Sequence, residues 1–237
     1  MARDWAVTAL TQAMVAHGSL FQWAAAQTTR DALHGRGVAW STVLPAGAGG
    51  EPNTPVVVRH TRHGGLFASV TGDLFAMPTR APRELATAVQ LASAGVMTPE
   101  VIAYAVHRVA GVLARSDVMT RRLPEGRDLP DAWRAAPPGD ARDALIDAVA
   151  TLLRALSSCD AQHADLNVKN VYVATEGPSV TAYVLDVDRV TFMNDPHVSA
   201  QNFARFARSA RKWNALHALD FDDSALVRLA TLAWVDG

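Results

Sequence analysis

The fold of this chain is decided by one short stretch, His163–Ala164–Asp165–Leu166–Asn167–Val168–Lys169–Asn170. Within it, Asp165 lies five residues before Asn170. Phosphoryl transfer needs a carboxylate near the acceptor hydroxyl and an amide oxygen that helps to hold a metal ion on the phosphates. The Asp-to-Asn spacing is that of the catalytic loop H-R-D-x-x-x-x-N. The stretch therefore predicts that Asp165 is a catalytic residue and that Asn170 is a metal ligand.

A second carboxylate follows at the end of an apolar run. Asp186 lies 21 residues after Asp165 and comes directly after Ala182–Leu185. The run predicts a buried strand, and a carboxylate at its end matches the second metal-binding residue of a kinase. A histidine before an aspartate alone is usually a local hydrogen-bonded pair. The added amide and the later carboxylate make the kinase interpretation more specific, with Asn170 and Asp186 as the metal site.

Composition narrows the class of protein. The chain has 237 residues, which is enough for one sizeable domain or for two small lobes. Apolar residues make up 49%, so a packed core is expected, and the formal net charge of −1 gives no sign of nucleic-acid binding. Cys159 is the only cysteine, so no intrachain disulfide can form, which fits a reducing cytoplasm.

Residues 1–30 are expected to form a helical extension. Apolar residues recur at helical spacing over residues 4–16. The segment Trp5–Thr29 has no charged residue, but glutamines and a histidine interrupt its apolar character. It therefore predicts neither a signal peptide nor a membrane span, and a soluble cytoplasmic protein is the expectation.

Residues 31–122 are expected to form a small nucleotide-binding lobe. Gly35 and Gly37 lie between alternating residues, a pattern that predicts a hairpin turn. Glycines let backbone amides approach phosphates closely, although an ordinary hairpin turn is the commoner explanation. A basic loop containing Arg62 follows further along the chain.

The small lobe also carries a candidate ion pair. The β-branched run Val56–Val58 predicts a strand that ends at Arg59, where kinase-like lobes carry a phosphate-binding lysine. A helix is predicted over Pro82–Ala94, and its Glu84 lies 25 residues after Arg59 as the expected partner. The residues of this helix expected in the core are Leu85, Val89 and Leu91.

Residues 123–237 are expected to form a mainly helical catalytic lobe. Apolar spacing predicts helices over Asp140–Ser158 and near Ala200–Leu219. Between them, a hairpin is expected to pair Val171–Val173 with Tyr183–Leu185. The second helix carries a row of cations, Arg205, Arg208 and Lys212. Together the elements predict an α+β chain with a protein-kinase-like two-lobe fold.

The order of these motifs resembles the 3-deoxy-D-manno-octulosonic acid (Kdo) kinases of the lipopolysaccharide kinase (Kdo/WaaP) family. The segments that carry the resemblance are Gly35–Gly37, Val58–Gly65, Arg83–Glu84, His163–Asn170, Leu185–Arg189 and Asn202–Lys212. The resemblance implies transfer of phosphate from ATP, with Mg²⁺, to a Kdo hydroxyl on a lipid A precursor. It also implies peripheral contact with the anionic cytoplasmic face of the inner membrane. Neither nucleic acid nor an obligate protein partner is expected.

The resemblance also implies roles for individual residues. Asp165 would orient or deprotonate the acceptor hydroxyl, and Asn170 and Asp186 would hold Mg²⁺. The residues implied for the nucleotide are Gly35, Gly37, Arg59 and Glu84. The implied acceptor is anionic, so basic side chains are expected to meet it, and the candidates are Arg62, Arg205 and Arg208, with His60 and Lys212.

Two departures from the family pattern bear on details of the site and not on the reaction class, and two other interpretations stay open for other reasons. Val187 stands where phenylalanine is common, and Lys169, expected to face solvent, stands where a neutral residue or histidine is usual. One alternative is an aminoglycoside- or choline-type phosphotransferase, which shares the same loop spacing. The other is a nucleotide-binding pseudokinase, which Arg59 in place of lysine would suggest.

Overall fold

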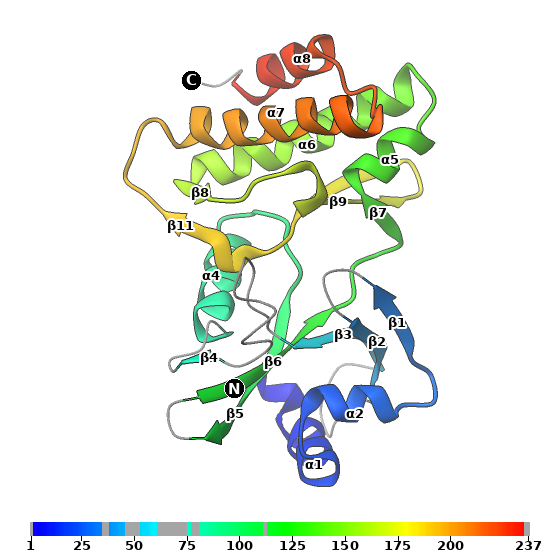
Figure 1. Cartoon of the computed structure of the whole chain (residues 1–237), viewed down its shortest axis with the longest axis vertical. Coiled ribbons are helices and arrows are strands. Elements are labelled where there is room, and N and C mark those ends of the chain that lie inside the picture. The colour runs from blue at the N-terminus through cyan, green and yellow to red at the C-terminus, as the bar shows by residue number, and fades with distance from the viewer. Residues whose placement is uncertain are drawn as a thin grey trace. The chain divides into compact units, whose positions relative to one another are not determined.

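The chain folds into two compact units, which are described separately (Figure 1). The computed structural model describes residues 2–34, 38–45, 53–60, 75–76, 81–110 and 113–234. The first unit comprises residues 1–86 and 100–122, and the second comprises residues 87–99 and 123–237. Both helices and antiparallel strands are present, so the expected α+β class is confirmed. None of the described helices is long and apolar enough to span a membrane.

An antiparallel sheet with two N-terminal helices forms most of the first unit. The sheet runs in the order β1-β2-β3-β6-β4, and β5 pairs with β6. The helices are α1 (Val7–His17), which follows a 3₁₀ turn (Asp4–Ala6), and α2 (Leu20–Ala26). The strands are β1 (Asp31–His34), β2 (Val38–Leu44), β3 (Thr54–His60), β4 (Phe75–Ala76), β5 (Val101–Ala110) and β6 (Leu113–Arg121). The predicted strand at Val56–Val58 is confirmed as part of β3.

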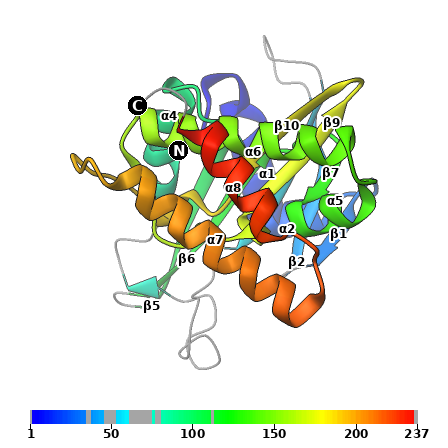
Figure 2. The same ribbon diagram turned by 90° about the horizontal axis from the view of Figure 1, so that it is seen from above.

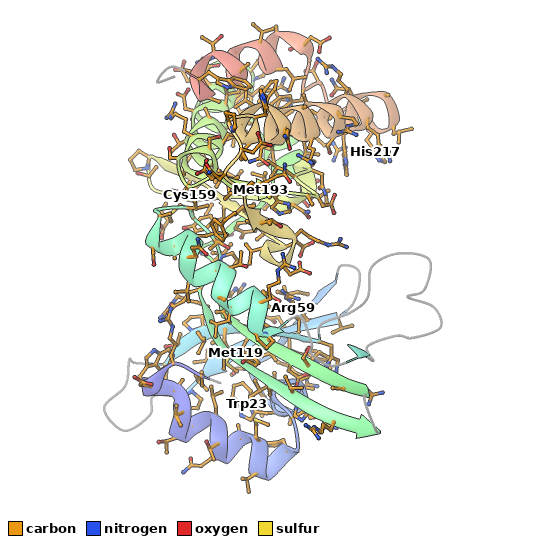
Figure 3. All side chains as sticks on the ribbon, turned by 90° about the vertical axis from the view of Figure 1, so that its left-hand side faces the viewer. Trp23, Arg59, Met119, Cys159, Met193 and His217 are labelled. Carbon is orange, nitrogen blue, oxygen red and sulfur yellow. The ribbon has the colours of Figure 1, made fainter. Side chains whose placement is uncertain are left out.

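The core of the first unit lies between the N-terminal helices and one face of the sheet. Successive strand residues point to opposite faces. Val56 and Val58 of β3 are therefore fully buried in the same cluster as Leu20 and Trp23 of α2. Figure 3 shows Trp23 beside the sheet residue Met119, another member of this cluster. The alternation leaves Arg59 pointing to the face opposite these helices.

Helix α4 (Ala81–Ser93) confirms the predicted helix but not its buried face. Val89 is 41% exposed and Leu85 is half-buried, so the expectation that both are core residues was wrong. Glu84, Thr87, Ala88 and Leu91 are the buried residues instead. The apolar pattern misplaced this face because it treats a glutamate as a solvent residue, whereas Glu84 is buried in an ion pair.

Helices and short strands build the second unit. The helices are α5 (Leu129–Ala135), α6 (Asp140–Ser158), α7 (Val198–His217) and α8 (Asp223–Ala233). The strands are β7 (Gly126–Asp128), β8 (Ala161–His163), β9 (Val171–Glu176), β10 (Ser179–Val184) and β11 (Val190–Phe192). Antiparallel pairing joins β7, β9 and β10 in one sheet and β8 with β11 in another. The predicted hairpin is the β9–β10 pair.

Helix α6 is the centre of the second unit and packs against α7, α8 and β10 (Figure 2). Its first turn carries Asp140 and Asp143, and negative charges stabilise the positive end of a helix dipole. Its apolar face buries Leu145, Val149 and Leu156, among others. The helix ends at Ser158, directly before β8, so its packing fixes where the segment of the predicted catalytic loop begins.

Candidate functional site

The predicted catalytic loop is organised by Asn167. This residue caps the 3₁₀ turn η2 (Val168–Asn170), and its Oδ1 accepts from the backbone N–H groups of Lys169 (3.0 Å) and Asn170 (3.1 Å). Its Nδ2 donates to Asp165 Oδ1 at 3.1 Å. Asn170 Nδ2 in turn donates to the backbone oxygen of Asp165 at 2.8 Å. The structure thus brings Asp165 and Asn170 together, and the sequence analysis assigned no role to the residue that does so.

His163 connects this loop to the segment of the second predicted metal ligand. Its Nδ1 accepts from the backbone N–H of Asp165 at 3.2 Å, so Nε2 carries the proton and donates to the Leu185 oxygen at 2.9 Å. The side chain is fully buried, and this burial lowers the pKa of the imidazole below its ordinary value, despite the opposing effect of its bond to Leu185. A neutral imidazole therefore fixes the spacing between Asp165 and Asp186.

Asp186 has a strained backbone and an open carboxylate. The backbone N–H of Leu185 donates to the backbone oxygen of Asn170 at 2.8 Å. The next residue, Asp186, therefore lies close to the catalytic loop. Its φ of 54° lies in the left-handed region, which costs a non-glycine residue about 1–3 kcal/mol. Its side chain is exposed and makes no hydrogen bond or ion pair within the described part of the chain. Strain of this kind is typical of functional sites, because surrounding structure must hold it.

The oxygens at this site suit magnesium. Asn170 is buried and uses its Nδ2 within the loop, while its Oδ1 takes no hydrogen bond from any described residue. Asp186 adds an unpaired carboxylate. Among the described residues, no group of three His, Cys, Asp or Glu side chains is arranged to hold a metal ion. Mg²⁺ commonly binds through one or two protein oxygens together with substrate phosphates, so this donor set fits it.

The first unit holds the predicted ion pair of Arg59 and Glu84. The Arg59 guanidinium donates to Glu84 Oε1, and the two residues lie on β3 and α4. The Glu84 side chain is 4% exposed and that of Arg59 is 35% exposed, so the arginine keeps an accessible edge (Figure 3). A buried carboxylate requires such a partner, because an unpaired buried charge is strongly destabilising. Three other predicted residues, Gly35, Gly37 and Arg62, lie outside the described residues.

A row of cations lies on α7 beside the catalytic loop. Arg205, Arg208 and Lys212 recur at helical spacing and share one face, and none has a partner among the described residues. On the adjacent face, Ser209 Oγ accepts from the backbone N–H of Val168 at 3.2 Å. The unpaired cations therefore border the turn that carries Asn170.

Helix α7 also supplies a buried residue that the sequence analysis did not single out. Asn202 is 1% exposed; its Oδ1 accepts from the His163 N–H at 3.0 Å, and its Nδ2 donates to the Ala161 oxygen at 2.8 Å. It thus extends the hydrogen bonding of β8 to the helix. The available signal was a lone amide on an otherwise apolar helix face, next to Phe206.

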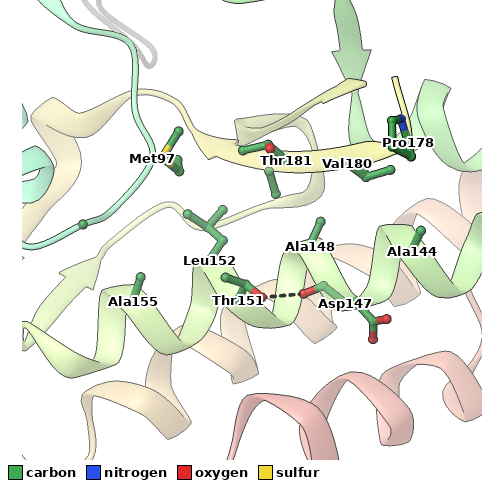
Figure 4. A pocket seen from close by; sticks show the side chains of 12 residues that line it. Met97, Ala144, Asp147, Ala148, Thr151, Leu152, Ala155, Pro178, Val180 and Thr181 are labelled. Atoms are coloured by element: carbon green, nitrogen blue, oxygen red, sulfur yellow. Dashed lines mark hydrogen bonds between the residues drawn. The ribbon is translucent and has the colours of Figure 1, made fainter. Parts of the chain in front are cut away.

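A separate groove in the second unit contains none of the predicted site residues. It has a volume of about 340 Å³ and lies between α6, β10 and the loop after α4 (Figure 4). Its lining includes Met97, Ala148, Thr151, Val180 and Thr181. The Thr151 hydroxyl is already used, because it donates to the Asp147 backbone oxygen at 2.9 Å. The lining also includes Asp147 of α6 but none of the residues predicted for catalysis or for nucleotide binding.

Comparison with known proteins gives one consistent family. The model of the family described as "Lipopolysaccharide kinase (Kdo/WaaP) family" matches residues 22–226. A 3-deoxy-D-manno-octulosonic acid kinase of Vibrio cholerae serotype O1 is 26% identical over 182 residues, which are 75% of this chain and 72% of the relative. The protein of that name from Actinobacillus succinogenes is 26% identical over 205 residues, covering 80% and 78%.

A solved structure gives the same fold. The structure of WaaP in complex with acyl carrier protein aligns with a TM-score of 0.57 at 18% identity, covering 92% of this chain and 83% of that chain. At this level of identity the likeness concerns the fold alone. It confirms the predicted protein-kinase-like fold.

Proposed function

The chain belongs to the lipopolysaccharide kinase (Kdo/WaaP) family, and we propose that it transfers the γ-phosphate of ATP to a hydroxyl of a Kdo sugar on a lipid A precursor. The observation that carries the proposal is the joining of Asp165, Asn170 and Asp186 through His163, Asn167 and Leu185. A pseudokinase has no need to keep all three groups in place. The curated relatives are named as Kdo kinases, which supports the choice of acceptor.

In this proposal, Asp165 accepts or orients the proton of the acceptor hydroxyl. Its Oδ1 is held by Asn167, so the carboxylate has a defined direction in the absence of substrate. Asn170 and Asp186 hold Mg²⁺ through their free oxygens. Bound magnesium supplies neutralisation of the charge that develops on the phosphate oxygens. Most of the catalytic effect then comes from positioning and electrostatics.

The nucleotide phosphates are proposed to contact Arg59. Its guanidinium is fixed by Glu84 and retains exposed surface for a second anion. Arginine stays charged at all relevant pH values and can bind two phosphate oxygens side by side, unlike lysine. Gly35 and Gly37 are proposed to cover the phosphates, as the family resemblance implies.

The acceptor is proposed to meet the cationic face of α7. A Kdo sugar carries a carboxylate and lipid A carries phosphates, so the acceptor is anionic. Arg205, Arg208 and Lys212 have no carboxylate partner among the described residues and border the catalytic loop, so they are available for those groups. Arg62 is proposed to add to this surface. The same cations would favour peripheral contact with the anionic cytoplasmic face of the inner membrane.

The first test is transfer of label from γ-³²P-ATP, with Mg²⁺, to Kdo–lipid IVA. We expect labelled lipid with the wild-type chain. Asp165→Asn keeps the shape of the side chain but removes its charge and basicity, and we expect it to lower kcat at least about 100-fold. Equilibrium binding of ATP to the variant should stay close to wild type, because Asp165 acts on the acceptor.

The matched control is Asp147→Asn, which removes an exposed carboxylate from α6. It should label the lipid at the wild-type rate. Absence of label with the wild-type chain, together with measurable ATP binding, would reject the Kdo acceptor. Equal rates for Asp165→Asn and Asp147→Asn would remove Asp165 from the mechanism.

Acceptor recognition is tested by the double variant Arg205→Gln/Arg208→Gln. Loss of two charge-assisted contacts should raise the KM for the lipid acceptor about tenfold or more, while the KM for ATP changes little. Arg211→Gln is the control, because Arg211 lies on the same helix but pairs with Asp223. Unchanged acceptor KM in the double variant would show that these arginines only face solvent.

A further inference from the structure

Lys169 does not simply face solvent, contrary to the expectation from the sequence. Its ammonium forms an ion pair with Asp128, at the end of β7, and lies 5.6 Å from the ring centre of Trp213 on α7. We propose that this bridge makes Lys169 a positioning residue that holds the turn carrying Asn170, and hence the metal ligand, in its active geometry. The inference rests on the proposed kinase function and goes beyond it, because it assigns a role to a residue that departs from the family pattern.

The carboxylate that receives Lys169 is itself fixed. Asp128 caps α5, since its Oδ1 accepts from the Asp131 N–H at 3.0 Å while its Oδ2 meets the Lys169 ammonium. Its backbone pairs with Tyr172 of β9. The side chain is only 19% exposed. Helix capping and strand pairing therefore give Lys169 a rigid anchor.

The aromatic partner is equally constrained. The Trp213 ring packs against the His217 ring, with 4.4 Å between centroids, and the Arg134 guanidinium lies 5.6 Å from its centre. Arg134 in turn donates to the His217 backbone oxygen. A cation over a tryptophan face is attracted by the ring. Lys169 thus joins two fixed groups on two elements of the same unit.

The position of Lys169 makes this bridge relevant to the metal ligand. It lies between Val168, whose N–H is held by Ser209, and Asn170, whose N–H is held by Asn167. It is one of only two lysines in a chain whose other cationic side chains are arginine or histidine. A compact ammonium differs from a planar guanidinium in the geometry of the contacts that it can make. We therefore expect Lys169→Arg to restore the function only in part.

The structural test is hydrogen exchange of the nucleotide-free protein. Lys169→Met removes the cation and keeps much of the apolar stem. Asp128→Asn removes the anion but retains an oxygen that caps α5. In both variants we expect the amides of Lys169 and Asn170 to exchange about fivefold faster, because exchange reports local opening. The melting temperature should change little, since the pair is partly exposed.

The matched control is Arg142→Met. Arg142 also bridges a carboxylate and an indole, because it pairs with Asp220 at 2.8 Å and lies 4.8 Å from the Trp133 ring centre. It belongs to the same unit, but its hydrogen bonds and ion pair go to Ala136 and Asp220 and not to the catalytic loop. Its loss should leave exchange at Lys169 and Asn170 unchanged. Faster exchange there in this control would mean that the effect is general loosening, and would overturn the proposal.

The kinetic test separates positioning from substrate binding. Both Lys169→Met and Asp128→Asn should lower kcat several-fold and raise the Mg²⁺ concentration needed for half activity, with the acceptor KM unchanged. The double variant should be no worse than either single variant, because the two residues act as one unit. A raised acceptor KM in Lys169→Met alone would instead make Lys169 an acceptor contact. The exchange experiment needs no acceptor, so it decides this proposal even if the Kdo assignment fails.

Discussion

A buried neutral histidine is the residue on which the geometry of the site depends. His163 receives one hydrogen bond from Asp165 and gives one to Leu185, so a single ring fixes both sides of the proposed metal site. A protonated ring could not accept from the Asp165 N–H, because both nitrogens would then be donors. The arrangement therefore holds only while the imidazole is neutral. Burial keeps it so by lowering its pKa.

This dependence predicts how stability changes with pH. The pKa of His163 is lower in the folded chain than its ordinary value of 6.5, so in mild acid the unfolded chain binds more protons than the folded chain. The resulting stability is present above pH 6.5 and is lost as the pH falls through the folded pKa. We expect the free energy of unfolding, measured with urea, to fall between about pH 7.5 and about pH 5.5.

The variant His163→Gln isolates this contribution. Its amide can still donate to the Leu185 oxygen but does not titrate, so the loss of stability in acid should be smaller than in the wild-type chain. His17→Gln, at the exposed end of α1, should retain the full loss. The idea fails if His163→Gln and the wild-type chain lose stability equally over this pH range.

Among the helices and strands, local sequence pattern correctly predicted those whose signals lie close together in the chain. The bounds of α6 match the predicted Asp140–Ser158, because acidic residues mark its start and an apolar stripe marks its face. The β9–β10 hairpin follows from two β-branched runs around Gly177. The catalytic loop was predicted from the five-residue spacing of Asp165 and Asn170. This spacing is short enough to be recognised in the sequence as a local motif. The structure places these residues together.

Contacts between distant segments could not be predicted in this way. Asp117 of β6 is fully buried; its carboxylate bonds His60 Nδ1 at 2.7 Å and accepts from the Phe21 N–H at 3.0 Å. Burial alone would raise the pKa of Asp117, but these hydrogen bonds, together with electrostatic attraction by His60 and His107, outweigh it and lower the pKa. Phe21 is 96 residues away in sequence, so no local spacing reveals the pair. The same reason explains why the bridge from Lys169 to Asp128 was missed.

For the whole molecule, the N-terminal segment is part of the core and not an appendage. The family match begins at residue 22, yet Ala6, Leu10, Ala13 and Leu20 belong to the core cluster of the first unit. The same cluster includes Val58 of β3, the residue before Arg59. Packing by a segment outside the family match therefore supports the strand that carries the proposed phosphate ligand.

This arrangement predicts that truncating Trp23 destabilises the first unit. Trp23 is 6% exposed in α2, and replacing a buried tryptophan by alanine costs about 3–5 kcal/mol. We expect Trp23→Ala to lower the free energy of unfolding by an amount in this range, measured by circular dichroism in urea. Val15→Ala is the control, because Val15 is 84% exposed on α1 and its loss should change stability by no more than about 0.5 kcal/mol. Equal effects of the two substitutions would show that the N-terminal helices do not stabilise the sheet.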